Sequence, residues 1–305
     1  MNKMSTSRSS KNIAIGYVYV ALAALLWAVS GTASKYLFNH GLSAFRVVQL
    51  RTTISFAGLF IWLFLRSPSL LKIAVKDLFY FFLLGTCGIG AAQFFYLFAI
   101  SKISVAAAIL LHYTGPVFVA LYAVLWKHDR LKPATVLAVA GTLVGCFFVV
   151  GAYNVDLLSV NRTGIIGGIC AALAFATYSV LSEYGMRTYD PWTVLFYAML
   201  FAAGMWNILH PPLEAFGHDY SIIEWGWIFF IGVFGTILPF GFYFEGINRI
   251  RSTHASITAT LEPITAAGIS FVFLGESLGV LQMLGGALVI ASILFLQRTQ
   301  QAAKT

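Results

Sequence analysis

The sequence predicts an all-α membrane protein with ten transmembrane helices, arranged as two inverted five-helix repeats. Three observations predict this fold class. Of the 305 residues, 59% are hydrophobic and only 10% are charged, whereas about a quarter of the residues in soluble proteins are charged. The hydrophobic residues form continuous runs of roughly 20 residues, which is the length that a helix needs to cross a bilayer. The second half of the chain also repeats the residue pattern of the first half.

The hydrophobic runs are expected to be helices, because they are continuous, whereas the strands of a membrane barrel alternate apolar and polar residues. The connections between them are short and contain most of the prolines and charges. The ten expected spans are residues 13–36, 44–65, 78–100, 104–126, 134–152, 164–184, 191–210, 225–247, 252–274 and 279–297.

The internal repeat is defined by residues that recur at one spacing (263 − 116 = 147). Pro116 then corresponds to Pro263, and two glycines of the third span correspond to two glycines of the eighth. Because each copy has five spans, an odd number, the second copy must enter the membrane upside down, as in many secondary transporters. The expected units are a tail at 1–12, a first repeat at 13–152, an outer linker at 153–163, a second repeat at 164–297 and a tail at 298–305.

The positive charges predict the orientation of the chain. Lys and Arg are concentrated in the loops that share a side with the N-terminus, such as residues 127–132, so both termini are expected to be cytoplasmic. The net charge of +8 is therefore spread over short loops as an orienting signal. It indicates a lipid bilayer as the partner and argues against nucleic acid. The three cysteines lie in apolar runs, and no metal or cofactor motif is found.

Three segments resemble one known family. They are AALLWAVSGTASKYL in the first span, LHYTGPVFVALYAVLWKHDRL in the fourth and LEPITAAGISFVFLGESL in the ninth. The chain resembles the EamA-type members of the drug/metabolite transporter superfamily over about residues 13–297. The resemblance implies a bundle with a central cavity between the halves, built mainly from the first, third, fourth, sixth, eighth and ninth spans. It implies little about the substrate, because the family handles amino acids, other metabolites, nucleotide-sugar-like molecules and drugs.

Glu262 is the first candidate for function. It precedes Pro263 near the middle of the ninth span, where an ionised carboxylate costs several kcal/mol unless it is paired, hydrated or protonated. Pro263 also frees a backbone carbonyl about four residues earlier, so polar atoms gather at this depth. Glu262 is therefore expected to bind a cationic group or to exchange a proton. The alternative is a protonated or capped glutamate that braces a helix kink.

His112 and Tyr113 precede Pro116 at a similar depth in the fourth span. A histidine titrates near neutral pH, so His112 is a second candidate for proton coupling and for binding a carboxylate. The alternative is a histidine bonded to a neighbouring helix. Since adjacent helical residues point about 100° apart, only one of the two is expected to face the cavity. Tyr113, on the same face as Pro116, is preferred.

The remaining candidates for substrate binding are aromatic or weakly polar residues in the spans. Trp27 stands out, because tryptophan is usually found at membrane interfaces and a mid-span tryptophan suggests either a cavity wall or plain packing. Each of the others is, taken singly, more often a core residue than a ligand contact. They are Ser30, Gln93, Tyr96, Phe175, Tyr178, Tyr243 and Thr258.

Other features suggest gates and helix packing. Pro116 and Pro263 are expected to break their helices, and Glu183 and Glu245 end two spans on the inner side, near basic residues. Ion pairs there, and at Arg51 in an outer half, are interpreted as gates, with snorkelling or static pairs as the alternative. Paired glycines such as those in residues 141–145 permit close helix contact, within a monomer or across a homodimer.

These features predict a secondary transporter of small organic solutes in a bacterial inner membrane. An exporter of amino acids or related metabolites is the favoured function, and a proton-coupled importer of a cationic or zwitterionic nutrient is the main alternative. A passive channel is a further alternative. An intramembrane enzyme would need a catalytic cluster, and the sequence has none; it also lacks a GxxxxGK[ST] phosphate loop.

Overall fold

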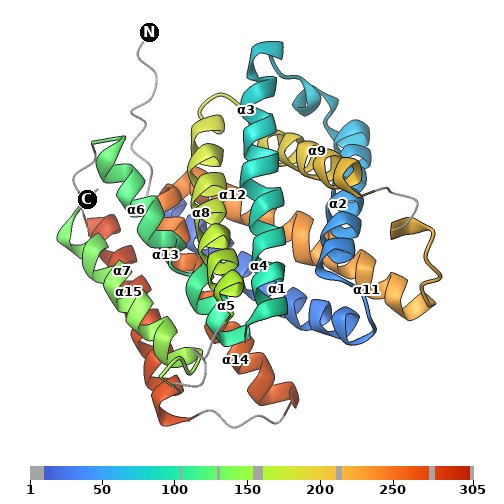
Figure 1. Cartoon of the computed structure of the whole chain (residues 1–305). Helices are drawn as coiled ribbons and strands as arrows, with labels where there is room; N and C mark the ends of the chain where they lie inside the picture. Colours follow the sequence, from blue (N-terminus) through green and yellow to red (C-terminus); the bar gives the residue numbers. More distant parts are fainter. Residues whose placement is uncertain are drawn as a thin grey trace.

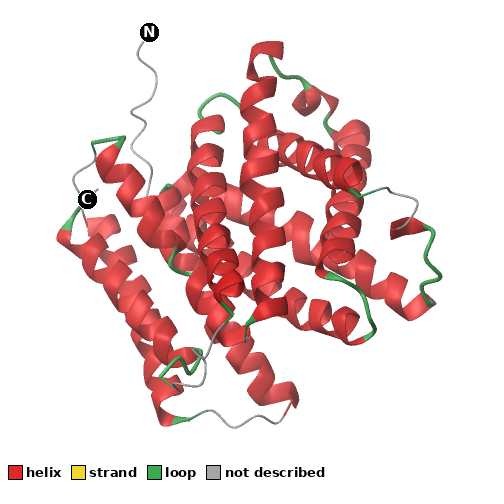
Figure 2. Ribbon diagram, viewed as in Figure 1, coloured by secondary structure: helices red, strands yellow, loops and turns green. Residues whose placement is uncertain are grey.

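The computed structural model describes residues 10–103, 105–128, 131–153, 161–210, 215–274 and 279–302. All regular secondary structure in these residues is helical (Figures 1 and 2). Eight helical segments are long and apolar enough to cross a membrane, and Pro133–Val149 is a shorter apolar helix. The expected ninth span, 252–274, is divided between two short helices.

The two halves of the chain have the same succession of elements. The first half contains α1 (Ser10–Asn39), α2 (Ala44–Arg66), α3 (Leu78–Leu83), a π-helical segment (Leu84–Gly90), α4 (Ala91–Lys102), α5 (Val105–His112), α6 (Gly115–Leu125) and α7 (Pro133–Val149). The second contains α8 (Arg162–Gly185), α9 (Pro191–Leu209), α11 (Ile222–Gly232), a π-helical segment (Val233–Ile237), α12 (Leu238–Ile250), α13 (Ser252–Ala259), α14 (Leu261–Leu274) and α15 (Val280–Ala302).

Local signals in the sequence explain where several helices begin. Ser43 and Asp190 accept backbone N–H groups at the starts of α2 and α9, which satisfies donors that have no partner inside a helix. Ser221 and Glu224 form a capping box at the start of α11. Pro133 and Pro191 stand in the first turns of α7 and α9, where a missing N–H costs nothing.

Two pairs of helices hold the halves together by equivalent contacts. The start of α1 packs against the end of α12, where a Cβ added to Gly16 would lie 2.6 Å from the side chain of Ile250. The start of α8 packs against the end of α4, where a Cβ added to Gly164 would lie 2.4 Å from Ile103. Gly16 and Gly164 correspond at a spacing one residue longer than that of the prolines (164 − 16 = 148), so the same close contact is made twice, once by each half.

Two further pairs join helices that occupy the same position in the two halves. Early in α2, Gln49 bonds to Asn207 late in α9, and late in α2, Trp62 packs on Trp192 at the start of α9. The helices α7 and α15 also run in opposite directions, side by side in Figure 1, with Gly145 against Gly285 at their crossing. Equivalent helices therefore meet antiparallel. The paired glycines of α7 and α15 serve packing within this chain.

Candidate functional site

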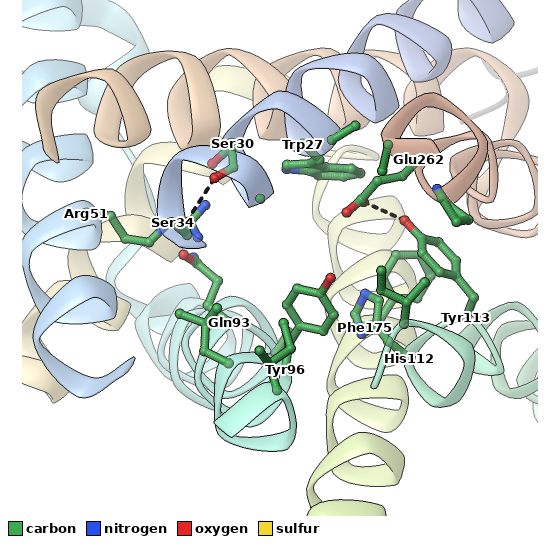
Figure 3. A pocket seen from close by; sticks show the side chains of 18 of the residues that line it. Trp27, Ser30, Ser34, Arg51, Gln93, Tyr96, His112, Tyr113, Phe175 and Glu262 are labelled. Carbon is green, nitrogen blue, oxygen red and sulfur yellow. Dashed lines mark hydrogen bonds between the residues drawn. The ribbon is translucent and has the colours of Figure 1, made fainter. Parts of the chain in front are cut away.

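A cavity of about 300 Å³ lies between the two halves of the molecule. Its walls come from α1, α2, α4, α5, α8, α12 and α14, together with the break after α5. Figure 3 shows side chains from both halves pointing into it. Nine of the sequence-predicted residues line it: Trp27, Ser30, Gln93, Tyr96, His112, Tyr113, Phe175, Tyr178 and Glu262.

Both halves break a helix beside this cavity. α5 ends at His112 and α6 begins at Gly115, while α13 ends at Ala259 and α14 begins at Leu261. A threonine hydroxyl bonds to the carbonyl three residues earlier at each break: Thr114 to Leu111 at 2.7 Å and Thr260 to Ile257 at 2.6 Å. Each carbonyl also accepts the backbone N–H of the same threonine, at 3.1 Å for Leu111 and 3.2 Å for Ile257, so the hydroxyl adds a second bond where the helix is interrupted. The two prolines, Pro116 and Pro263, follow within three residues, and Pro263 lines the cavity.

The two breaks are joined by one hydrogen bond. The hydroxyl of Tyr113, at the first break, donates to Oε2 of Glu262, at the second, over 2.5 Å (Figure 3). Tyr113 is 1% exposed, so the bond lies away from bulk solvent, where a hydrogen bond to a charged group is strongest. The carboxylate is thereby held against the wall formed by the opposite half.

His112 and Tyr113 both line the cavity, together with Ile109, although only one of the two was expected to face it. The Tyr113 N–H still donates to the Ile109 carbonyl as in a helix, and positions i, i+3 and i+4 share one broad helix face, so the 100° step does not keep either ring out of the cavity wall. The His112 ring lies 5.0 Å from Tyr96 and 5.2 Å from Phe175, centroid to centroid. Its Nδ1 has no hydrogen-bond partner among the described residues.

The aromatic wall is built around Trp27. Its ring packs on Phe240 and Tyr243, with centroids 5.3 Å away in each case. Tyr243 itself does not line the cavity; it lies behind this wall, fully buried, with its hydroxyl 2.8 Å from the Ser179 hydroxyl. Thr258 does not line the cavity either, because its hydroxyl donates to the backbone carbonyl of His254 within α13.

Arg51 is a cavity residue that sequence reasoning placed elsewhere. The sequence suggested a gate charge in the outer half of the second span, but the side chain lines the cavity (Figure 3). Its Nε–H donates to the Thr236 hydroxyl at 3.0 Å and its Nη2 to the Gly235 carbonyl at 2.8 Å. Both acceptors belong to the π-helical segment before α12. Such segments often occur at functional sites, but their positions cannot be read from hydrophobic periodicity.

The comparison with known families decides what this arrangement is. The model of the EamA-like transporter family matches the chain twice, at residues 14–151 and 162–298. The chain belongs to this EamA family. Its two matches correspond to the two halves that repeat the same elements, and the family is one of transporters rather than enzymes.

Relatives of this EamA protein are described as transporters. It is 31% identical to an uncharacterized transporter of Archaeoglobus fulgidus, over 67% of this chain and 71% of that protein. It is 25% identical to the uncharacterized inner membrane transporter YicL of Salmonella typhimurium, over 92% and 94%, and 23% identical to the threonine/homoserine exporter RhtA of Escherichia coli K12, over 67% of each. A solved crystal structure with 20% identity superposes with a TM-score of 0.76 over 94% of this chain and 96% of that one, which shows a shared fold.

The two glutamates that were expected at gates lie at one end of this EamA bundle. Glu183, at the end of α8, accepts three hydrogen bonds: from Nζ of Lys127 at 3.1 Å, from Nε of Arg251 at 3.4 Å and from the backbone N–H of Ser252 at 2.7 Å. It therefore ties helices of both halves together. Glu245 pairs with Arg249 within α12. This end of the bundle is called the Glu183 end below.

No metal site is found in the described residues. No group of three or more His, Cys, Asp or Glu side chains there is close enough to hold an ion. The three cysteines are free, and each lies in a different helical segment: Cys87, Cys146 and Cys170. The polar groups of the site are those of the cavity and the Glu183 end.

Proposed function

We propose that this EamA protein is a secondary transporter of small organic solutes, and that it exports amino acids or related metabolites across a bacterial inner membrane. The observation that carries the proposal is the cavity between the two repeats, with Glu262 and Arg51 in its walls. Burying ionisable groups at the depth of a membrane is costly, and such groups usually mark a transport pathway. RhtA, a relative, exports threonine and homoserine.

We further propose that the chain crosses the membrane ten times, with inverted repeats and both termini in the cytoplasm. The antiparallel meeting of α2 with α9 and of α7 with α15 supports the inversion. The split helices α13 and α14 would together form the ninth span. The excess of Lys and Arg in loops on the side of the N-terminus supports the orientation, and the name of the relative YicL supports the inner membrane.

The proposed mechanism is alternating access with the Glu183 end closed. The cavity residues of α1 run from Trp27 to Phe38, in the half of this helix that lies away from the Glu183 end. At the Glu183 end, α1 is packed on α12 through Gly16, and Glu183 joins Lys127 to Arg251. In the proposed orientation the cytoplasmic side is closed. Opening it requires these ion pairs to separate while the broken helices bend.

Glu262 supports a second candidate, a proton-coupled importer of a cationic or zwitterionic nutrient. Its carboxylate lies in the cavity, where a proton and a cationic solute can compete for it. His112 lies nearby, its Nδ1 without a partner among the described residues. Solute flux measured in proteoliposomes with and without a pH gradient separates the two candidates. Import that needs an acidic outer side favours the importer, and efflux down the solute's own gradient favours the exporter.

The site assignment is tested by two substitutions in a flux assay with a library of labelled solutes. We expect Glu262→Gln and Trp27→Ala to lower the flux of any transported solute at least tenfold. The elution volume in size-exclusion chromatography and the thermal unfolding midpoint should not change. Trp126→Ala is the matched control, because Trp126 is 71% exposed and does not line the cavity. Normal transport by both cavity variants would show that the site lies elsewhere.

A further inference from the structure

The two charged side chains of the cavity lie on opposite sides of it. Among the described residues that line the cavity, two are charged, Arg51 and Glu262. Figure 3 shows Arg51 on one side with Gln93, and Glu262 on the other with Tyr113, separated by the space beside Trp27. They come from different halves of the chain, on α2 and α14. The fold therefore holds a cation and an anion apart across one small volume.

The Arg51 side has unused hydrogen-bond donors. A guanidinium carries five N–H donors, and the bonds found for Arg51 in the described residues go to two neutral oxygens, of Thr236 and Gly235. The ion pairs found among the described residues involve side chains other than Arg51. Gln93 is 7% exposed, and both polar atoms of its amide are buried and have no hydrogen-bond partner among the described residues. A buried cation and an unpaired amide in the wall of one cavity fit an oxyanion, since guanidinium and N–H donors bind carboxylates most strongly.

The Glu262 side has the opposite character. Its carboxylate accepts one bond, from Tyr113, although an ionised carboxylate has about four acceptor positions. The face of Trp27 and the rings of Tyr96 and Tyr113 surround the space in front of it (Figure 3). Aromatic faces and a carboxylate together attract ammonium groups. This side fits the cationic end of a solute.

Within the proposed class of amino acids and related metabolites, we propose that the cavity prefers zwitterions whose two charges are at opposite ends of the molecule, over α-amino acids such as those in the name of RhtA. The anionic group of such a zwitterion lies at Arg51 and Gln93, and its cationic group lies at Glu262. A solute with one charge leaves the other protein charge uncompensated in a buried place, which is unfavourable. The inference rests on the proposed function only in treating the bound solute as the one carried; the binding itself can be measured without transport.

The test compares four small probes by calorimetric titration of the purified full-length protein in detergent. The probes are 5-aminopentanoate, pentanoate, pentylamine and glycine. We expect 5-aminopentanoate to bind at least tenfold more tightly than pentanoate and pentylamine, which each lack one charge. It should also bind more tightly than glycine, whose two charges are adjacent, because Figure 3 shows Arg51 and Glu262 on different sides of the space beside Trp27.

Substitutions then assign each charge to its side. Arg51→Gln should raise the dissociation constants of 5-aminopentanoate and pentanoate at least tenfold and should not weaken the binding of pentylamine. Glu262→Gln should weaken the binding of pentylamine and 5-aminopentanoate and should not weaken that of pentanoate. Arg51 also bonds to the π-helical segment before α12, so its substitution changes the packing there as well as the charge. Gln93→Glu is therefore the second variant. It adds a repelling charge without removing those bonds and should act like Arg51→Gln. Arg66→Gln, at the exposed end of α2, is the matched control and should change nothing.

Two results would overturn the inference. One is equal binding of the zwitterion and its singly charged analogues, and the other is binding of glycine as tight as that of 5-aminopentanoate. Flux measured on the same preparations separates this outcome from failure of the proposed function. Selective binding without transport of any solute would remove the transporter and keep the two charged sides. Transport without charge selectivity would keep the transporter and remove this inference.

Discussion

The breaks in the fourth and ninth spans share a backbone and differ in the residue before proline. In the first break this residue is Gly115, and in the second it is Glu262. Gly115 lies so close to α8 that an added Cβ would be 2.6 Å from the ring of Phe175. Glu262 instead lines the cavity and accepts the Tyr113 hydroxyl. One break is thus a packing contact and the other supplies a charge.

The difference shows how a duplicated fold acquires a polar direction. The repeated backbone provides the bends and the cavity, because both halves end a helix at the same depth. The side chains provide the asymmetry. Arg51 follows the same principle: it lies in α2, whereas α9, the equivalent helix of the other half, contains no charged residue. Among the described residues, the cavity therefore has one basic and one acidic side chain at positions that the repeat does not duplicate.

The largest effect should come from giving Gly115 a side chain. Gly115→Ala places a Cβ against Phe175 and 3.3 Å from the Ala172 carbonyl, and overpacking of this kind costs about 2–3 kcal/mol. We expect a clear fall in the thermal unfolding midpoint of the purified protein. Gly268→Ala in α14 is the matched control, because no heavy atom lies within 4 Å of the added Cβ; it should be neutral or slightly stabilising. Equal behaviour of the two variants would contradict the close packing of the first break.

Much of this architecture could be predicted from residue patterns, because the bilayer imposes long apolar helices and the duplication repeats their order. Pro116 and Pro263 marked both breaks, since a proline in a helix removes a backbone bond wherever it occurs. Polar and aromatic residues at mid-span depth, such as Trp27 and Gln93, are costly or unusual in lipid, and the cavity is where the structure places them.

The parts that could not be predicted depend on backbone detail or on the partner helix. Arg51 was interpreted as a gate charge. Its neighbours in the sequence do not reveal that the π-helical segment of the other half supplies its acceptors, Gly235 and Thr236. His112 and Tyr113 both line the cavity because its wall follows the helix face that they share with Ile109, and the width of that wall depends on the neighbouring helices. Tyr243 has helical spacing like that of its neighbours, and only its contact with Ser179 shows that it lies behind the wall.

A smaller effect should come from cutting the bond between the two breaks. Tyr113→Phe removes the donor to Glu262 without changing the packing of the ring, and a double-mutant cycle with Glu262→Met, which has no carbonyl acceptor, isolates the interaction. We expect a coupling energy of about 1–2 kcal/mol for this buried hydrogen bond to a charged group. It is measured as the non-additive part of the change in unfolding free energy. Additive effects would mean that the two breaks are energetically independent, although the structure joins them.

The smallest effect concerns what the breaks have in common. Thr114→Val and Thr260→Val each remove a hydroxyl that adds a second bond to the carbonyl three residues earlier, so each should cost about 0.5–1 kcal/mol, as a single hydrogen bond does. Thr177→Val is the control, because the Thr177 hydroxyl makes its bond to the Leu173 carbonyl at an exposed position inside the unbroken helix α8, where no break needs support. Similar losses at both breaks and none at Thr177 would show that the repeated backbone needs the same support in each half. A loss at one break alone would mean that the two bends are held by different forces, and that only their shape is repeated.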